Sequence, residues 1–352
     1  MTGTAILIGC PAVKGAGRAS AARSSGSSNA RTMRPKALAV SEWGFACTMV
    51  PYLCERWGNP SSPYRFGNEA RAAVERARER VAEVVGCKPA EIVFCSSGTE
   101  SDNLALRGVA HALRSRGNHI VTTAIEHLAV LNTCKALEKQ GCRVTYLPVD
   151  RDGVVDMVAL ASSLAADTIL ITVMHANNEV GTIQPMTEIA ALARTRGIRV
   201  HTDAAQSAGK IPVDVVAMGV DLLSLAGHKL YAPKGVGALC IRKGVMLETF
   251  MHGAGQEMGR RAGTENILEI VGLGKACEIA ARNLKHNCRH MLAMRDRLQA
   301  GITAAVADVR LNGHPEKRLP NTLSLSFRNI EANRLLEAIG SEVAASAGAA
   351  CH

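Results

Sequence analysis

One stretch of the sequence places an acid, an amide and a lysine where a single small molecule could contact all three. It covers residues 200–235 and reads VHTDAAQSAGKIPVDVVAMGVDLLSLAGHKLYAPKG. Asp203 follows a short β-branched run and Lys229 follows a second apolar run, so we expect each residue just past the carboxyl end of a buried strand. Ligands of open α/β sheets bind in the crevice at such strand ends.

A carboxylate and a lysine across such a crevice are what pyridoxal phosphate (PLP) chemistry requires. The lysine forms a Schiff base with the aldehyde, and the aspartate keeps the pyridine nitrogen protonated, so that the ring accepts electrons from a substrate carbanion. Taken singly, an aspartate after a strand such as Asp203 is more often a turn or helix cap, and a lysine beside glycine and proline such as Lys229 is more often solvated. Gln206, one turn after Asp203 as a donor to the ring hydroxyl, and His228, next to the lysine, favour the cofactor site.

A second motif lies upstream, where the small-residue loop SSGTESDN follows a predicted strand at residues 91–95 and opens a helix. Free backbone N–H groups and the helix dipole favour an anion at such a position. We interpret the loop as the cradle of the PLP phosphate, with Gly98 and Thr99 as contacts and His228 closing it from the other side. As a lone motif, the same residues would be a plain helix cap.

The segments HTDAAQ and GHKLYAPKG resemble the NifS/IscS-type cysteine desulfurases and selenocysteine lyases of the class V aminotransferase superfamily. The resemblance extends over residues 41–352, with several motifs in the family's order and spacing. It implies the α/β fold of type I PLP-dependent transferases, a mainly parallel seven-stranded sheet covered by helices, plus a smaller, incomplete α+β domain. Strands that alternate with helices between residues 90 and 242 agree with such a sheet.

The resemblance implies roles for three further residues. His127 would stack on the pyridine ring and shuttle protons, although a histidine at a strand–helix junction is usually a cap. Asn178 would hydrogen-bond the O3′ side of the cofactor and the substrate, whereas its neighbours Asn177 and Glu179 are turn formers. Thr264 would reach the phosphate in the partner subunit of a homodimer; as an alternative or in addition, it caps the helix that follows it. Ala226 stands where many relatives carry a serine phosphate ligand.

The nucleophile is the residue that depends most on the resemblance. The chain ends SAGAACH, and without the resemblance Cys351 would be an incidental terminal thiol. In the family this motif carries the thiolate that attacks the sulfur of the PLP-bound cysteine and holds it as a persulfide. His352 completes an A-A-C-H ending that is similar to that of selenocysteine lyases and some bacterial desulfurases.

Three regions are expected along the chain. Residues 1–40 are basic and contain no acidic residue, as in a transit peptide, a disordered tail or an incorrectly predicted first exon. We expect residues 41–287 to form the large PLP-binding domain, in which Asn68 caps a charged helix. Residues 288–352 should form a small, truncated domain with a final strand at residues 342–345. The family's N-terminal Asn-Ala-Thr-Thr-like segment and its C-terminal, carboxylate-binding arginine have no match. We therefore expect a truncated or incorrectly predicted family member that binds substrate weakly, unless Arg260 or Arg261 substitutes.

The composition of the 352-residue chain, 47% hydrophobic and 20% charged, is that of a globular protein, and no apolar run approaches the length of a membrane helix. The formal charge is +10, but dispersed basic residues and 3% aromatics argue against nucleic-acid binding. The eleven cysteines are scattered without zinc spacing, so we predict no metal site and a reducing compartment, either the cytoplasm or an organelle matrix.

The predicted activity is that of a PLP-dependent cysteine desulfurase. It would convert L-cysteine to L-alanine and leave a persulfide on Cys351 for an acceptor or scaffold protein, in the supply of iron–sulfur clusters or other thio-cofactors. Selenocysteine lyase, which releases selenium from L-selenocysteine, is the nearest alternative. A catalytically impaired, PLP-binding homologue is an alternative of another class, because of the two missing segments.

Overall fold

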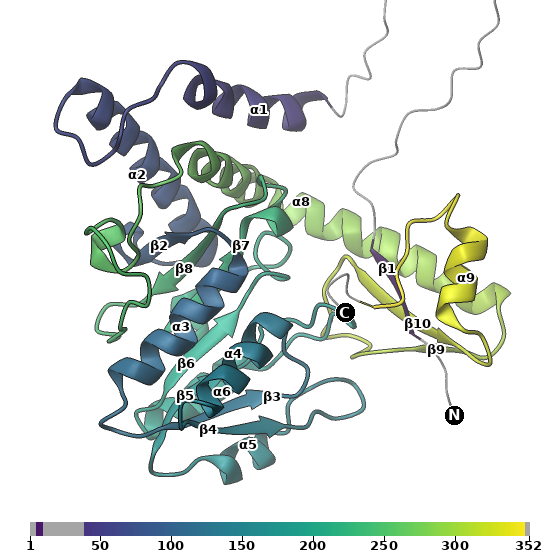
Figure 1. The fold of residues 1–352 in the computed structure, drawn as a ribbon. Helices are drawn as coiled ribbons and strands as arrows, with labels where there is room; N and C mark the ends of the chain where they lie inside the picture. The colour runs from purple at the N-terminus through teal and green to yellow at the C-terminus, as the bar shows by residue number, and fades with distance from the viewer. Residues whose placement is uncertain (1–4, 10–38, 349–352) are drawn as a thin grey trace, which may run out of the picture.

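The computed structural model describes residues 5–9 and 39–348, with side chains described for residues 47–348. Its helices and strands form two sheets with helices around them (Figure 1). The helices are α1 (Ala39–Cys54), α2 (Arg65–Val85), α3 (Gly98–Ala112), α4 (Leu128–Glu138), α5 (Met157–Ser163), α6 (Met186–Thr195), α7 (Val215–Met218), α8 (Ile267–Ala305) and α9 (Ala332–Ile339). The strands are β1 (Ala5–Gly9), β2 (Ile92–Cys95), β3 (His119–Thr123), β4 (Arg143–Leu147), β5 (Thr168–Thr172), β6 (Arg199–Asp203), β7 (Leu222–Ala226), β8 (Gly237–Ile241), β9 (Val309–Leu311) and β10 (Thr322–Phe327).

The larger sheet has seven strands in the order β2-β8-β7-β6-β5-β3-β4. Strand β8 runs antiparallel to both of its neighbours, and the other adjacent pairs are parallel. Parallel strands need crossover connections, which the intervening helices supply. The predicted mainly parallel, helix-covered sheet is therefore confirmed.

Both faces of this sheet are buried, because its central strands are buried along their length rather than alternating with exposed residues. Every residue of β5, β7 and β8 is buried. Successive residues point to opposite faces, so Leu222 packs in the core shared with α3 and α4, whereas Leu223 packs in the core shared with α2 and α6. Helices α3 and α4 thus cover one face of the sheet and α2 and α6 the other.

The smaller unit is a three-stranded antiparallel sheet, β1-β10-β9, with α9 packed against it. Helix α8 runs without a break from the large sheet to this unit (Figure 1). The boundary expected at residue 287 therefore falls inside a continuous helix. This unit agrees with the predicted small α+β domain in its strands β9 and β10 and in α9.

Three details differ from the sequence-based expectations. No element was expected before residue 41, yet β1 pairs with β10, with Ala5 opposite Ser326. A strand expected at residues 342–345 is irregular, because Glu342 N and Val343 N both donate to the carbonyl of Ile339 in a turn. The helix expected to begin after Asn68 begins at residue 65, since the Asn68 side chain hydrogen-bonds Pro63 O instead of capping.

Candidate active site

The candidate site lies at the carboxyl ends of β6 and β7, which are adjacent and parallel. Asp203 is the last residue of β6 and lies opposite Ser224 of β7. A short 3₁₀ helix, Gly227–Leu230, follows β7 directly and carries Lys229. It ends at Tyr231, which has a positive φ of 63° and whose N–H donates to Gly227 O. The two strand ends thus hold the acid and the lysine at one edge of the sheet, as predicted.

The carboxyl of Asp203 is buried, and its electrostatic neighbours identify the groups around it. Burial raises its pKa, while the N–H of Ala205 and the electrostatic influence of His127 and Lys229 lower it. The N–H of Ala205 donates to Oδ1 at 2.8 Å. The structure therefore brings the predicted Asp203, His127 and Lys229 within electrostatic range of one another.

The start of α3 has the form of an anion cradle. Ser97 is the N-cap, and its hydroxyl accepts the N–H of Glu100 at 3.1 Å. The N–H groups of Gly98 and Thr99, the first two residues of the helix, precede its first internal hydrogen bond and can donate to a ligand. A Cβ on Gly98 would lie 2.9 Å from the Cβ of Ala226, so only glycine fits without a shift. This contact joins the cradle to the end of β7.

An ion pair ties the segment that carries Thr264 to this cradle. Arg261 Nε lies 2.8 Å from Glu100 Oε1, and the other carboxylate oxygen accepts the N–H of Ser96 at 2.7 Å. Arg261 is therefore engaged by Glu100. In contrast, Nη1 of Arg260 is buried and has no hydrogen-bond partner among the described residues. Of the two cations expected to bind a substrate carboxylate, Arg260 is the one with donors to spare.

His127 is the N-cap of α4, and its Nδ1 accepts the N–H of Ala129 at 3.1 Å. A neutral ring therefore carries its proton on Nε2. Asn177 is a turn former, as expected, because its Oδ1 accepts N–H groups from Glu179 and Val180. Asn178 follows it and is half-buried.

The rim of the site is basic. Gln206 is half-buried, and its backbone carbonyl accepts a hydrogen bond from Nζ of Lys210 at 2.8 Å. Burial and the charge of Lys229 lower the pKa of Lys210 to about 8. Partial burial and the charges of Lys229 and Lys210 lower the pKa of His228. His228, Lys229 and Lys210 thus lie close together, and such a rim attracts an anionic ligand.

Two predicted residues lie outside this cluster. Thr264 is exposed, and the helix cap expected there is instead Asn266, whose side chain accepts the N–H of Glu269. Cys351 lies in the C-terminal segment 349–352, outside the described residues. The predicted roles of Thr264 and Cys351 therefore stay predictions.

Sequence reasoning missed the buried polar residues beneath the site. Asp102 and Glu126 are carboxyls within a few per cent of full burial, and burial raises the pKa of Glu126 to about 8. His201 is fully buried. Glu126 and His201 adjoin apolar residues, where a polar side chain requires a partner, whereas Asp102 lies between Ser101 and Asn103 and gives no such signal.

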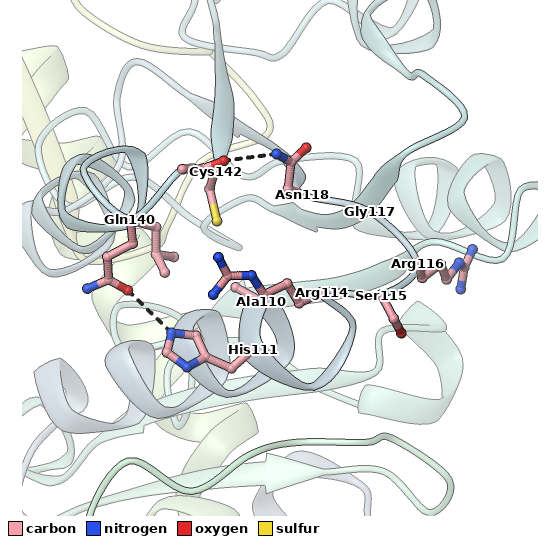
Figure 2. Close-up of a pocket in the computed structure, with 11 residues that line it drawn as sticks. Ala110, His111, Arg114, Ser115, Arg116, Gly117, Asn118, Gln140 and Cys142 are labelled. Carbon is pink, nitrogen blue, oxygen red and sulfur yellow. Dashed lines mark hydrogen bonds between the residues drawn. The ribbon is translucent and has the colours of Figure 1, made fainter.

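A separate cavity of about 280 Å³ lies at the amino ends of β3 and β4, whereas the candidate site lies at the carboxyl ends of β6 and β7 (Figure 2). Arg114 points into it, and His111 hydrogen-bonds Gln140 on one wall. It contains none of the predicted site residues. Among the described residues, no group of His, Cys, Asp and Glu could hold a metal ion, and no helix is both long and apolar enough to cross a bilayer.

Comparison with known proteins gives consistent matches. The sequence model of the class-V aminotransferase family matches residues 46–352. Cysteine desulfurase IscS of Dictyoglomus turgidum is 49% identical over 304 residues, which cover 86% of this chain and 77% of the relative. Two solved structures, a NifS-like protein and SspA in complex with cysteine, match with TM-scores of 0.81 and 0.75 at 42% and 36% identity; the matches cover 85% of this chain and 82% and 83% of theirs.

The fold, the strand-end site and these matches agree. The chain belongs to the class-V aminotransferase family, within its group of NifS/IscS-type cysteine desulfurases. The resemblance inferred from the sequence motifs is thereby confirmed.

Proposed function

We propose that this protein is a PLP-dependent cysteine desulfurase. The observation that carries the proposal is the juxtaposition of buried Asp203 with Lys229 and His127 at the ends of β6 and β7. The names of its relatives support the same activity, since the Dictyoglomus turgidum protein is a cysteine desulfurase.

The residues present fit PLP. The N–H groups of Gly98 and Thr99 would hold the phosphate, with His228 on the opposite side and no Cβ in the way at residue 98. Asp203 would pair with the pyridine nitrogen, and Gln206 and Asn178 would donate to the ring oxygen. Lys229 would bond to the aldehyde. When bound, PLP supplies an electron sink for the carbanion at Cα of the substrate.

The residues of this chain would then move protons and sulfur. Lys229 would take the Cα proton of L-cysteine, and the carboxylate of Asp203 would keep the pyridine nitrogen protonated. The Cys351 thiolate attacks the substrate sulfur, so that an S–S bond forms while the Cβ–S bond breaks. The bonding electrons stay with the carbon skeleton, which takes up protons and leaves as L-alanine. Nε2 of His127, which would carry the proton of a neutral ring, would donate in these proton transfers.

L-Cysteine is the favoured substrate, because relatives are named for it and a matched structure, SspA, holds cysteine. The A-A-C-H ending favours selenocysteine lyase as a second candidate. Both substrates pass through the same residues, so their relative kcat/KM values decide between the two activities.

We also propose a homodimer in which Thr264 reaches the phosphate in the partner's site. Thr264 is exposed on a segment that Arg261 and Glu100 hold beside the cradle. Nearby, an opening of about 800 Å³ separates this segment from α2. Trp57, before α2, and Phe66, in its first turn, are exposed. A sulfur-accepting protein and a reducing compartment, cytoplasmic or organellar, complete the proposal.

The direct test measures alanine and sulfide released from L-cysteine by the PLP-loaded protein with a thiol reductant. We expect equal amounts of the two products, and loss of both in Cys351→Ser. Cys288→Ser, which changes a half-buried cysteine of α8, is the matched control and should keep the activity. Faster turnover of selenocysteine than of cysteine would favour the lyase, whereas PLP binding without turnover of either would indicate an impaired homologue.

A further inference from the structure

A row of buried polar side chains lies behind Asp203, on the face of the large sheet that α3 covers. His201 precedes Asp203 by two residues in β6, so the two side chains share that face. Ser224 of β7 lies opposite Asp203, and Thr172 of β5 lies opposite His201. Asp102 comes from the second turn of α3, which packs on β5, β6 and β7. The proposed chemistry uses none of these residues except Asp203.

The members of this row contact one another. Thr172 Oγ1 lies 2.8 Å from Nδ1 of His201, and Nε2 of His201 lies 3.0 Å from Ser224 Oγ. Nε2 is also 3.6 Å from Oδ1 of Asp102, and Ser224 hydrogen-bonds the Asp102 carboxyl. Thr172, His201 and Ser224 are completely buried, and Asp102 is 2% exposed. The row is therefore a buried, connected chain of hydrogen-bonding groups.

Three carboxyls share this buried region, and they differ in what could stabilise a negative charge. Asp203 has the N–H of Ala205 and lies near His127 and the cation Lys229. Glu126 accepts the N–H of Met174 and the hydroxyl of Thr123, both at 3.0 Å or less. These donors and the positive charge of Lys229 favour the ionised forms of the two carboxyls.

Asp102 has less support than either neighbour. Its partner is the hydroxyl of Ser224, and its Oδ1 has no hydrogen bond among the described residues. Burial, followed by the charges of Asp203 and Glu126, raises its pKa well above the ordinary value. A buried carboxylate without N–H donors or a cation is costly. Asp102 is the carboxyl that keeps its proton most easily.

His201 does not supply the missing cation. Burial lowers the pKa of His201 to about 3, so its imidazole is neutral at physiological pH. A neutral ring can link the hydroxyls of Thr172 and Ser224 as one donor and one acceptor. Asp102 is therefore neutral because it keeps its proton, and not because a charged histidine pairs with it.

We propose that Asp102 is a positioning residue that remains protonated behind Asp203, held by Ser224 and neutral His201, so that Asp203 is the single anion facing the cofactor's ring nitrogen. An ionised Asp102 would draw a proton onto Asp203 and weaken that pairing. The role towards the ring rests on the proposed function. The protonation of Asp102 is a property of the chain alone and can be measured without cofactor.

The first test is infrared spectroscopy of the cofactor-free protein at pH 7 and pH 9. Protonated carboxyl groups have a C=O stretching band that carboxylates lack. Glu126, with a pKa of about 8, should lose its band by pH 9, whereas the Asp102 band should remain and should vanish in Asp102→Asn. Asp203→Asn and Glu126→Gln are the matched controls and should keep it. Absence of any such band at pH 9, or its persistence in Asp102→Asn, would overturn the proposal. If Asp102→Asn fails to fold, the wild-type band at pH 9 that survives in both controls decides the question.

The second test follows the absorbance of the PLP-loaded protein against pH. Asparagine resembles a protonated carboxyl, so the midpoint in Asp102→Asn should lie within roughly 0.3 pH units of the wild-type value, whereas removing a buried negative charge would shift it by about one unit or more. A shift of that size contradicts the protonation of Asp102. A protein that binds no PLP contradicts the proposed function instead, and the infrared result on cofactor-free protein stands independently of it.

Discussion

At the scale of single residues, the carboxyl of Asp203 is the centre of the site's electrostatics. It is buried, but it lies near His127 and the cation Lys229. Replacement by asparagine would leave the protonated pyridine nitrogen of bound PLP buried without its partner, which typically costs about 2–5 kcal/mol. We therefore expect Asp203→Asn to weaken PLP binding roughly 30-fold or more, as measured by fluorescence titration. Asp156→Asn, which changes the N-cap of α5 to another good cap, should leave the affinity unchanged. Equal affinities in both variants would refute the role of Asp203.

Glu126 makes stability depend on pH. Its pKa is about 8 in the folded protein, far above that of an unfolded glutamate, so the folded state holds an extra proton between about pH 5 and pH 8. Stability therefore falls as pH rises through this window, by about 1 kcal/mol per pH unit. Urea unfolding of Glu126→Gln should show a shallower fall than the wild type. The exposed substitution Glu188→Gln should follow the wild-type curve, and parallel curves for all three proteins would rule out the buried acid.

Gly98 gives a steric prediction. The Cβ of Gly98→Ala would lie 2.9 Å from the Cβ of Ala226, so the start of α3 must shift away from β7. Such overpacking typically costs about 1–3 kcal/mol. We expect PLP to bind roughly 10-fold more weakly to Gly98→Ala, with affinity largely restored in the double variant with Ala226→Gly. A double variant no better than Gly98→Ala would show that the two residues do not form the cradle together.

At the scale of elements, a buried ion pair fixes the loop that leads to Arg261 and Thr264. Glu257 accepts two hydrogen bonds from Arg78 of α2, at 2.7 and 2.9 Å, and one from the N–H of Phe94 in β2. This arrangement holds Glu257 at a positive φ of 47°. The pair thus connects α2, β2 and the loop through one carboxylate.

Substitutions at two adjacent residues of this loop should differ in their effect on the free energy of unfolding. Glu257→Ala removes the buried partner of Arg78 and leaves it only the exposed Glu75 and the carbonyl of Ile92, so we expect a loss of about 3 kcal/mol in the free energy of unfolding. Met258 is exposed and has a φ of 58°, a conformation that glycine adopts without strain. Met258→Gly should therefore change stability by less than about 1 kcal/mol. Urea denaturation of both variants tests this, and similar losses would mean that the ion pair does not fix the loop.

The sequence predicted those elements whose pattern is local. The short β-branched run at residues 198–200 leads into β6, and the apolar run at residues 221–226 contains β7, so the positions of Asp203 and Lys229 could be placed in advance. The buried row behind Asp203 could not, because Asp102, His201 and Ser224 come together only when α3 packs on the sheet. Likewise β1 finds its partner at the other end of the chain, and a pairing of that kind leaves no local pattern.

At the scale of the whole molecule, a shared site between subunits can be tested by complementation. If Thr264 reaches the partner's phosphate, a heterodimer of Thr264→Asp and Lys229→Ala chains contains one intact site. Unfolding and refolding an equal mixture should then restore about a quarter of wild-type activity, although each variant alone is inactive or weak. The measurement is alanine release from L-cysteine. A mixture no more active than the average of its parents would contradict a shared site.

The most direct test of the account is the absorbance spectrum of the purified protein with PLP, compared between wild type and Lys229→Ala. Lys210→Ala is the matched control, because Lys210 is the neighbouring lysine and donates to Gln206 O. We predict a long-wavelength band from lysine-bound cofactor in the wild type and in Lys210→Ala, its absence in Lys229→Ala, and alanine release from L-cysteine by the first two proteins alone. The same band in Lys229→Ala, or no band in the wild type, would contradict the central claim that the ends of β6 and β7 form a PLP site.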